Sequence, residues 1–232
     1  MSPPLFEPAY LLHARPYRNT SLLADFFTLN HGRVNGVVRG ARGEKSKLRG
    51  FVQPFTPLMI NWIGHGDLVT IRQVEPARTT QNLKGEAILY GFYINELLAR
   101  LLKVREAHAD LYQAYETLLN YFVQGECAEQ HLRVFEKRLL LNLGYALQLT
   151  HEHHTDCSVE ANAWYTFVPD AGPQRVLDQA ATDFAVRGAS LLALHNENFT
   201  SIEILQDAKR LMRRALRSLL GDKPLKSREL FG

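Results

Sequence analysis

Short apolar runs separated by turn residues fill the first 80 residues of the chain. The pattern predicts strands at residues 9–13, 21–28, 33–39, 58–63 and 68–74. Asn30-His31-Gly32 and Gly64-His65-Gly66-Asp67 are predicted turns, because Asn and Gly tolerate a positive φ angle. Five short strands over about 80 residues indicate a small closed barrel, and the five-stranded OB-fold is the commonest of that size. An SH3-like barrel would give much the same pattern.

Leucines and aromatic residues recur at helical spacing after Glu75-Pro76. The spacing predicts helices at residues 86–103, 111–122, 132–143 and about 180–194. We therefore predict an α+β protein, with a five-stranded OB-fold barrel over residues 1–80 and an α-helical domain over residues 81–232. The helical domain contains an irregular insertion at about residues 150–175.

The last predicted helix is strongly amphipathic. Thr200 is its expected N-cap and Glu203 follows three residues later, which is the capping-box pattern. The helix is expected to end before Gly221 and Pro224. Its polar face carries the cations Lys209, Arg210, Arg213, Arg214 and Arg217.

Composition places the chain among ordinary globular proteins. Of its 232 residues, 46% are hydrophobic and 22% are charged. Its apolar runs are far shorter than the roughly 18 residues that cross a bilayer, so we expect no membrane contact. The N-terminus does not read as a signal peptide. Two cysteines do not indicate a disulfide framework and favour a cytoplasmic protein.

Charge is distributed unevenly along the chain. Residues 1–80 hold ten Lys and Arg against five Asp and Glu, a net charge of +5. Residues 208–232 have a net charge of +6, whereas residues 81–207 have a net charge of −8. Two basic ends around an acidic middle indicate a polarised surface, which bears on partners rather than on fold.

A basic segment follows the third predicted strand. Its cations, with Glu44 as the one acid among them, are Arg39, Arg42, Lys45, Lys47 and Arg49. Phe51 and Phe55 come directly after it. Lys and Arg neutralise phosphates and aromatic faces stack on bases, so the segment suits a nucleic acid. A solvated surface loop is the alternative that charge alone leaves open.

Motifs of common enzymes do not occur in the chain. It has no nucleophile elbow, P-loop, GxGxxG or HExxH pattern. Asp178 and Asp183 are five residues apart and do not share a helical face well. We predict no catalytic residues and no enzyme; a hydrolase with an unrecognised site is a rival that cleavage of labelled DNA with a divalent metal would expose.

One cluster resembles a metal site. His151, His153, His154 and Cys157 lie within seven residues. A structural zinc site usually takes two spaced pairs of ligands from distant segments, so this cluster favours a polar loop.

Several blocks in order along the chain point to a family. They are Tyr10-Leu-Leu-His-Ala-Arg-Pro-Tyr-Arg-Asn-Thr-Ser-Leu-Leu23, Arg39-Gly-Ala-Arg42, Gln53-Pro-Phe-Thr-Pro-Leu58, Tyr93-Ile-Asn-Glu-Leu-Leu98, Leu143-Gly-Tyr145 and Lys223-Pro-Leu-Lys-Ser-Arg-Glu-Leu-Phe231. Together they resemble the RecO family of bacterial recombination mediators, in its proteobacterial form. The resemblance covers nearly the whole chain.

The resemblance implies an OB-fold, a helical bundle, and a small region between helices that binds zinc in many relatives. It also implies binding to single- and double-stranded DNA and annealing of complementary strands. The implied partners are RecR and the acidic C-terminal tail of single-stranded-DNA-binding protein. The resemblance also implies a functional link to RecA, because members of the family help RecR to load RecA onto coated DNA. Relatives with zinc carry two CxxC pairs after the Leu-Gly-Tyr helix end, whereas this chain has only Cys157 there. We therefore predict no metal and no cofactor.

DNA contacts are predicted on the barrel, its basic segment and the last helix. The candidates are Arg15, Tyr17, Arg18, Arg33, Arg39, Arg42, Lys45, Lys47, Arg49, Arg210, Arg213, Arg214 and Arg217. Phe26, Phe27 and Trp62 are expected in the barrel core. The cations of the last helix alternatively face the acidic middle of the chain and serve structure. A further rival function is that of an OB-fold RNA- or ribosome-binding factor.

The tail of single-stranded-DNA-binding protein ends in acids and a Phe carboxylate. Its receptor needs an apolar pocket rimmed by cations. We place this pocket between the third helix and a neighbour. Its predicted residues are Leu132, Arg133, Phe135, Lys137 and Arg138. An ordinary amphipathic helix with solvated cations is the alternative.

Overall fold

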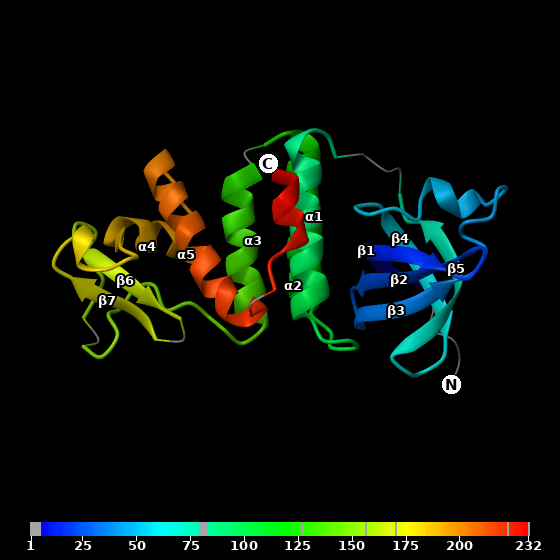
Figure 1. Cartoon of the computed structure of the whole chain (residues 1–232), viewed down its shortest axis with the longest axis horizontal. Helices are drawn as coiled ribbons and strands as arrows, with labels where there is room; N and C mark the ends of the chain where they lie inside the picture. The colour runs from blue at the N-terminus through cyan, green and yellow to red at the C-terminus, as the bar shows by residue number, and fades with distance from the viewer. Residues whose placement is uncertain are drawn as a thin grey trace. The chain divides into compact units, whose positions relative to one another are not determined.

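A computed structural model describes residues 6–78, 83–126, 128–155, 157–169, 171–221 and 223–231 (Figure 1). The chain divides into two compact units, one formed by Met1–Glu126 with Pro224–Gly232 and the other by Cys127–Lys223. The predicted domain limit near residue 80 lies inside the first unit, so the barrel and the first two helices belong to one body.

The first unit contains a closed five-stranded barrel. Its strands are β1 (Glu7–Tyr17), β2 (Ser21–Thr28), β3 (Gly32–Val38), β4 (Pro57–Ile63) and β5 (Leu68–Pro76). They close in the order β1-β2-β3-β5-β4. Only β3 and β5 pair in parallel among these strands, which is the OB-fold arrangement. All five predicted strands, and the OB-fold, are confirmed.

Alternate side chains of the strands fill the barrel. Leu11, Phe26, Val34, Ile60 and Trp62 are all buried in this core. Each large apolar side chain that is fully buried stabilises the fold by about 1.5–3 kcal/mol. The predicted burial of Phe26 and Trp62 in the barrel core is therefore confirmed.

Two helices cover part of the outer face of the barrel. They are α1 (Glu86–Leu101) and α2 (Ala109–Gln124). The rings of Tyr10 and Phe27 point out of the barrel and lie 5.6 and 5.4 Å from the ring of Tyr112 on α2. Asn95 on α1 donates to the carbonyl oxygen of Leu12 at 3.1 Å. Phe27 is therefore buried as predicted, but between barrel and helices rather than inside the barrel.

The second unit joins helices to a small sheet. Its elements are α3 (Ala128–Asn142), β6 (Trp164–Val168), β7 (Gly172–Val176), β8 (Val186–Arg187), α4 (Gly188–His195) and α5 (Ile202–Leu220). The sheet has the order β7-β6-β8. Short 3-10 helices are η1 (Lys47–Gly50), η2 (Gln179–Ala181) and η3 (Lys226–Phe231), of which η1 and η3 belong to the first unit.

Two local expectations for the second unit differ from the structure. The insertion at about residues 150–175, described as irregular, holds β6 and β7, and the helix expected at 180–194 begins only at Gly188. Short apolar runs do not distinguish strand from helix, which explains both differences.

The cap of α5 is Ser201 rather than Thr200, because the Ser201 hydroxyl accepts a hydrogen bond from the amide of Ile204 at 3.3 Å.

None of the helices in the described part of the chain combines the length and the apolar character that crossing a bilayer requires.

Candidate nucleic-acid interface

Two connections meet at one end of the barrel. The turn between β1 and β2 and the long connection between β3 and β4 are joined at Arg42, whose amide donates to the carbonyl of Thr20 at 2.8 Å. The Arg42 guanidinium also donates to the carbonyl of Arg18 at 3.3 Å. Ala41 beside it is buried in the barrel core. The two connections therefore form one continuous surface.

Most predicted DNA-binding cations lie exposed on this surface. A β-bulge between Leu11 and His13 shifts the register of β1, and Ala14 then packs on the core while Arg15 stays exposed. The guanidinium of Arg18 lies 5.2 Å from the ring centre of the half-buried Tyr17. We name the exposed cations the barrel-end cations: they are Arg15, Arg18, Arg39, Arg42, Lys45, Lys47 and Arg49. Such a surface suits phosphates.

Arg33 differs from the other predicted barrel cations. Its guanidinium donates to the carbonyls of Ala99 and, at 2.8 Å, of Leu102, at the C-terminal end of α1. Its Nε lies 3.3 Å from Oδ1 of Asp25. Carbonyls at a helix C-terminus lack partners within the helix and favour a cation. Arg33 thus ties the barrel to α1, and we do not carry it into the DNA interface.

The cations of α5 are divided between internal contacts and solvent. Arg214 donates to the carbonyl of Phe167 at 2.8 Å, and Arg210 pairs with Asp207 at 3.2 Å. Both guanidinium groups lie 5.1 Å from the ring centre of Phe184. Arg213 and Arg217 are exposed. The structural role that the sequence left open therefore applies to Arg210 and Arg214, while a role in DNA binding stays a prediction for all four.

The predicted tail-pocket residues do not line an open surface together. Leu132 and Phe135 are buried, and Arg133 is 4% exposed with its guanidinium 3.0 Å from Glu136. Lys137 and Arg138 both pair with Glu197, at 2.8 and 3.1 Å. Of these five residues only Lys137 and Arg138 reach solvent, and they already share the single carboxylate of Glu197.

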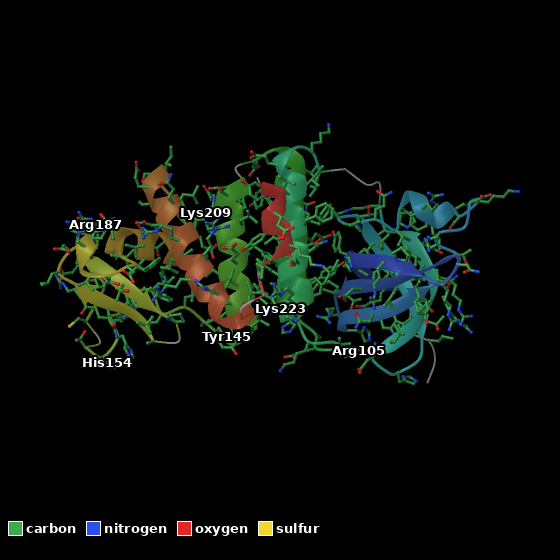
Figure 2. All side chains as sticks on the ribbon, in the orientation of Figure 1. Arg105, Tyr145, His154, Arg187, Lys209 and Lys223 are labelled. Atoms are coloured by element: carbon green, nitrogen blue, oxygen red, sulfur yellow. The ribbon has the colours of Figure 1, made fainter. Side chains whose placement is uncertain are left out.

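A pocket of about 340 Å³ does lie between α3 and its neighbours. It is lined by Leu140, Tyr145, Leu147, Phe167, Ala215 and Leu219, among others. Figure 2 labels Tyr145, which follows the end of α3 and is exposed. The five residues predicted for the tail pocket are not among those that line this cavity, and the site of the tail stays a prediction.

The residues of the insertion do not fit a zinc ion. His151 contacts the hydroxyl of Thr150 through Nδ1 at 2.9 Å, and the rings of His153 and His154 lie 3.5 Å apart. Among the described residues, no group of three or more His, Cys, Asp or Glu is placed to hold a metal. The absence of a metal stays a prediction.

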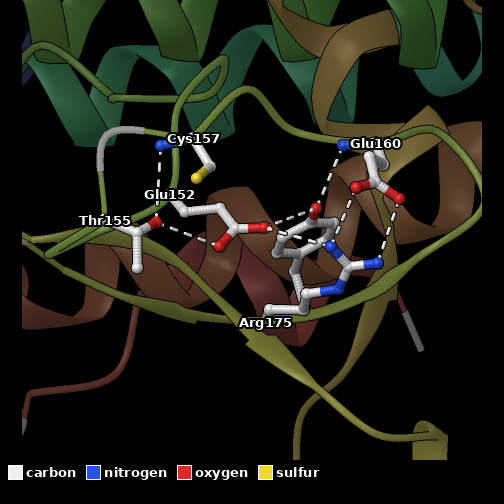
Figure 3. A network of polar contacts seen from close by, with 6 residues as sticks. Glu152, Thr155, Cys157, Glu160 and Arg175 are labelled. Atoms are coloured by element: carbon white, nitrogen blue, oxygen red, sulfur yellow. Dashed lines mark hydrogen bonds and ion pairs between the residues drawn. The ribbon is translucent and has the colours of Figure 1, made fainter.

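A polar network joins the chain segments of the insertion instead (Figure 3). The Tyr165 hydroxyl donates to Glu152 at 3.0 Å and accepts from the amide of Glu160 at 3.0 Å. Arg175 donates two hydrogen bonds to the Glu160 carboxylate, at 2.9 and 3.0 Å, and this pairing lowers the pKa of Glu160. These contacts connect β6 and β7 to Glu152 and Glu160.

Comparisons with known proteins cover nearly the whole chain. The family model described as "Recombination protein O N terminal" matches residues 1–80, and "Recombination protein O C terminal" matches residues 83–229. A protein of Nitrosococcus oceani named "DNA repair protein RecO" is 42% identical over 98% of this chain and 92% of its own. Proteins of the same name from Coxiella burnetii and Yersinia pestis are 43% and 38% identical, each over 97% of this chain and over 96% and 93% of their own.

Proposed function

Because the chain belongs to the RecO family of DNA repair proteins, we propose that it binds single- and double-stranded DNA through the barrel-end cations and anneals complementary strands. The supporting observation is that six of the seven exposed cations lie on two connections joined by the contact of Arg42 with Thr20, while the seventh, Arg15, lies near the end of β1. Phosphate contacts give affinity without sequence information, which an annealing protein needs.

The proposed mechanism is that of a bridge rather than a catalyst. Cations on the protein screen the repulsion between two phosphate backbones, so that complementary bases can meet. No step in this mechanism consumes a nucleotide. Annealing that required added ATP would contradict it.

We further propose that the protein works with RecR to load RecA onto DNA coated by single-stranded-DNA-binding protein. Recruitment to the coated DNA would use the acidic C-terminal tail of that coating protein. The pocket beside α3 offers an apolar seat for the terminal Phe of such a tail. Association with the nucleoid follows from DNA binding.

Anisotropy of labelled single-stranded DNA across a salt series tests the proposed function. The wild type is compared with a variant in which Arg39, Arg42, Lys45, Lys47 and Arg49 are all changed to Ala. Counterion release gives a slope of about −0.7 in log K against log[salt] for each phosphate neutralised on a single strand. We expect a steep slope for the wild type and a shallower one for the variant.

The same titration separates the rival functions. A wild type that binds weakly and without a salt slope would make the chain a protein-binding adaptor. Competition between DNA and RNA at fixed salt distinguishes the RNA-binding alternative, which predicts that RNA displaces the DNA. Incubation of labelled DNA with a divalent metal exposes a hydrolase by cleavage.

A further inference from the structure

The β3–β4 connection, which carries most barrel-end cations, is fixed at both of its ends. At its start the amide of Arg42 is bound to Thr20. At its end Pro54 pairs with Leu11 of β1, and Phe55 follows with a φ angle of +67°. A positive φ at an aromatic residue is strained and persists only where its surroundings enforce it. The surroundings of Phe55 therefore indicate what this strain serves.

The ring of Phe55 occupies a notch on α1. The notch exists because position 91 is glycine: a Cβ there would lie 2.7 Å from Cε1 and 2.8 Å from Cζ of Phe55. The Phe55 ring also meets the ring of Phe92 edge-on, with 5.2 Å between their centres. The Phe55 ring thus occupies space that the Cβ of any other amino acid at position 91 would fill.

The chain between the two anchors follows the barrel surface. Leu48 and Phe51 pack against the barrel core, and the amide of Val52 donates to Leu48 at 2.9 Å. The exposed cations Lys45, Lys47 and Arg49 therefore project from a short path that is held at Arg42 and at Phe55.

We propose that Phe55 is a positioning residue for DNA binding: its seat in the Gly91 notch of α1 holds the β3–β4 connection in the conformation that presents Lys45, Lys47 and Arg49 to phosphates. The ring does not itself contact DNA. Holding a segment in its bound conformation removes the entropy that binding would otherwise cost. This inference rests on the proposed DNA binding by the barrel end.

Two variants attack the seat from opposite sides. Phe55→Ala removes the ring, and Gly91→Ala fills the notch while leaving the ring in place. Ile88→Ala is the matched control, because Ile88 lies on the same helix, is exposed and is not among the nearest neighbours of a Cβ at position 91. Phe55→Gly is a second version of the first variant, since glycine accepts the positive φ and relieves the backbone while the ring is still lost.

The first readout needs no DNA. Trypsin cleaves after Lys and Arg, so the rates of cleavage after Lys45, Lys47 and Arg49 report how firmly the connection is held. Mass spectrometry measures these rates at a temperature where circular dichroism shows that every variant is folded. We expect Phe55→Ala, Phe55→Gly and Gly91→Ala to be cleaved there about tenfold faster than the wild type, as expected for local unfolding that becomes easier. Ile88→Ala should be cleaved at the wild-type rate. Unchanged cleavage in the three notch variants would overturn the inference.

The second readout is the salt series with labelled single-stranded DNA. A positioning role predicts that affinity falls about three- to tenfold in the notch variants while the slope against log[salt] stays at the wild-type value, because the same phosphates are contacted. Lys47→Ala, a contact variant, should lose part of the slope. A notch variant with wild-type affinity, or one that loses slope as Lys47→Ala does, would overturn the positioning role. A wild type without salt-dependent binding would instead overturn the proposed function.

Discussion

One carboxylate oxygen of Glu96 accepts hydrogen bonds from the backbone amide of Ser227 at 2.8 Å and from the hydroxyl of the same residue at 2.7 Å. Its other oxygen accepts the amide of Lys226 at 2.9 Å. Arg100, one turn further along α1, donates to the carbonyl of Pro224 at 3.2 Å. One face of α1 thus holds the segment Pro224–Phe231 to the first unit, although about a hundred residues of the second unit separate them in sequence.

Glu96→Gln should loosen this attachment. Burial opposes ionisation of Glu96, but the hydrogen bonds from Ser227 and Lys226 outweigh it and hold the pKa of the carboxyl below its usual range. The stability gained is then present at neutral pH and lost as the pH falls through that lowered pKa. We expect thermal and denaturant unfolding to show a loss of about 1–2 kcal/mol at about pH 7.

The pH dependence provides the control for that variant. Once the pH lies well below this lowered pKa the wild-type side chain is itself neutral, so at such acidic pH the difference in stability between wild type and Glu96→Gln should shrink. Glu86→Gln, at the exposed start of the same helix, should have little effect at either pH. A loss that is equal at both pH values would contradict a role for the ionised carboxylate.

Asp25→Asn should stabilise the protein at neutral pH. Burial raises the pKa of Asp25 to about 6, although Arg33 acts to lower it. An acid with a raised pKa holds its proton more tightly when the protein is folded, so stability falls as the pH rises from about 4 to about 6. The amide removes this penalty, and we expect a gain of about 1–2 kcal/mol at about pH 7.

The test is denaturant unfolding of wild type and Asp25→Asn between about pH 4 and about pH 8. The gain should be absent at the acidic end and reach its full size above about pH 6. Asp67→Asn, at an exposed turn, controls for the change in net charge. A variant that loses stability at neutral pH would mean that the attraction between Asp25 and Arg33 outweighs the cost of burying the charge.

The barrel was predictable from the sequence, whereas the role of each cation was not predictable. Trp62 and Phe26 stand in short apolar runs bounded by turn residues, and such runs indicate strands. Arg33 and Arg39 are chemically identical and lie six residues apart, yet one binds carbonyls of α1 and the other faces solvent. The difference between the two arginines depends on carbonyl groups at the end of a helix more than sixty residues further along the chain. The local sequence around each arginine therefore does not predict it.

The same limit explains the pocket residues and the anchor at Phe55. Leu132 and Phe135 belong to a helical stripe, and such a stripe does not reveal which of its turns is covered by neighbouring elements. The block from Gln53 to Leu58 was evident as a family resemblance, but the fit of Phe55 to Gly91 joins two elements distant in sequence. Contacts of this kind require the folded structure.

Tyr165→Phe should destabilise the second unit, and a chelator should not. The substitution removes the hydrogen bond to Glu152, which keeps the one from Thr155, and it leaves the amide of Glu160 without its acceptor, a loss of about 1–2 kcal/mol in total. Melting temperatures are measured for wild type and variant with and without a strong zinc chelator. Elemental analysis that found one zinc per chain, or a melting temperature lowered by the chelator, would contradict the metal-free network.

The pocket beside α3 makes a prediction for the partner tail. Tyr145 lines the pocket and is 45% exposed, so Tyr145→Ala removes a wall of the pocket without opening the core. A labelled peptide that ends in several acids and a Phe carboxylate should bind the wild type, and Tyr145→Ala should weaken it about tenfold, equivalent to about 1.4 kcal/mol. Anisotropy measures both affinities.

Leu141→Ala is the matched control for that experiment. Leu141 is 60% exposed near the same end of α3 but does not line the pocket, so its loss should leave peptide binding unchanged. Arg138→Ala tests the alternative site that the sequence predicts, at Lys137 and Arg138, against the pocket lined by Tyr145. Because Arg138 already pairs with Glu197, a seat at that position would have to displace this carboxylate, and Glu197→Gln would then tighten binding. Tighter binding by Glu197→Gln together with wild-type binding by Tyr145→Ala would move the tail from the pocket to the Lys137–Arg138 pair.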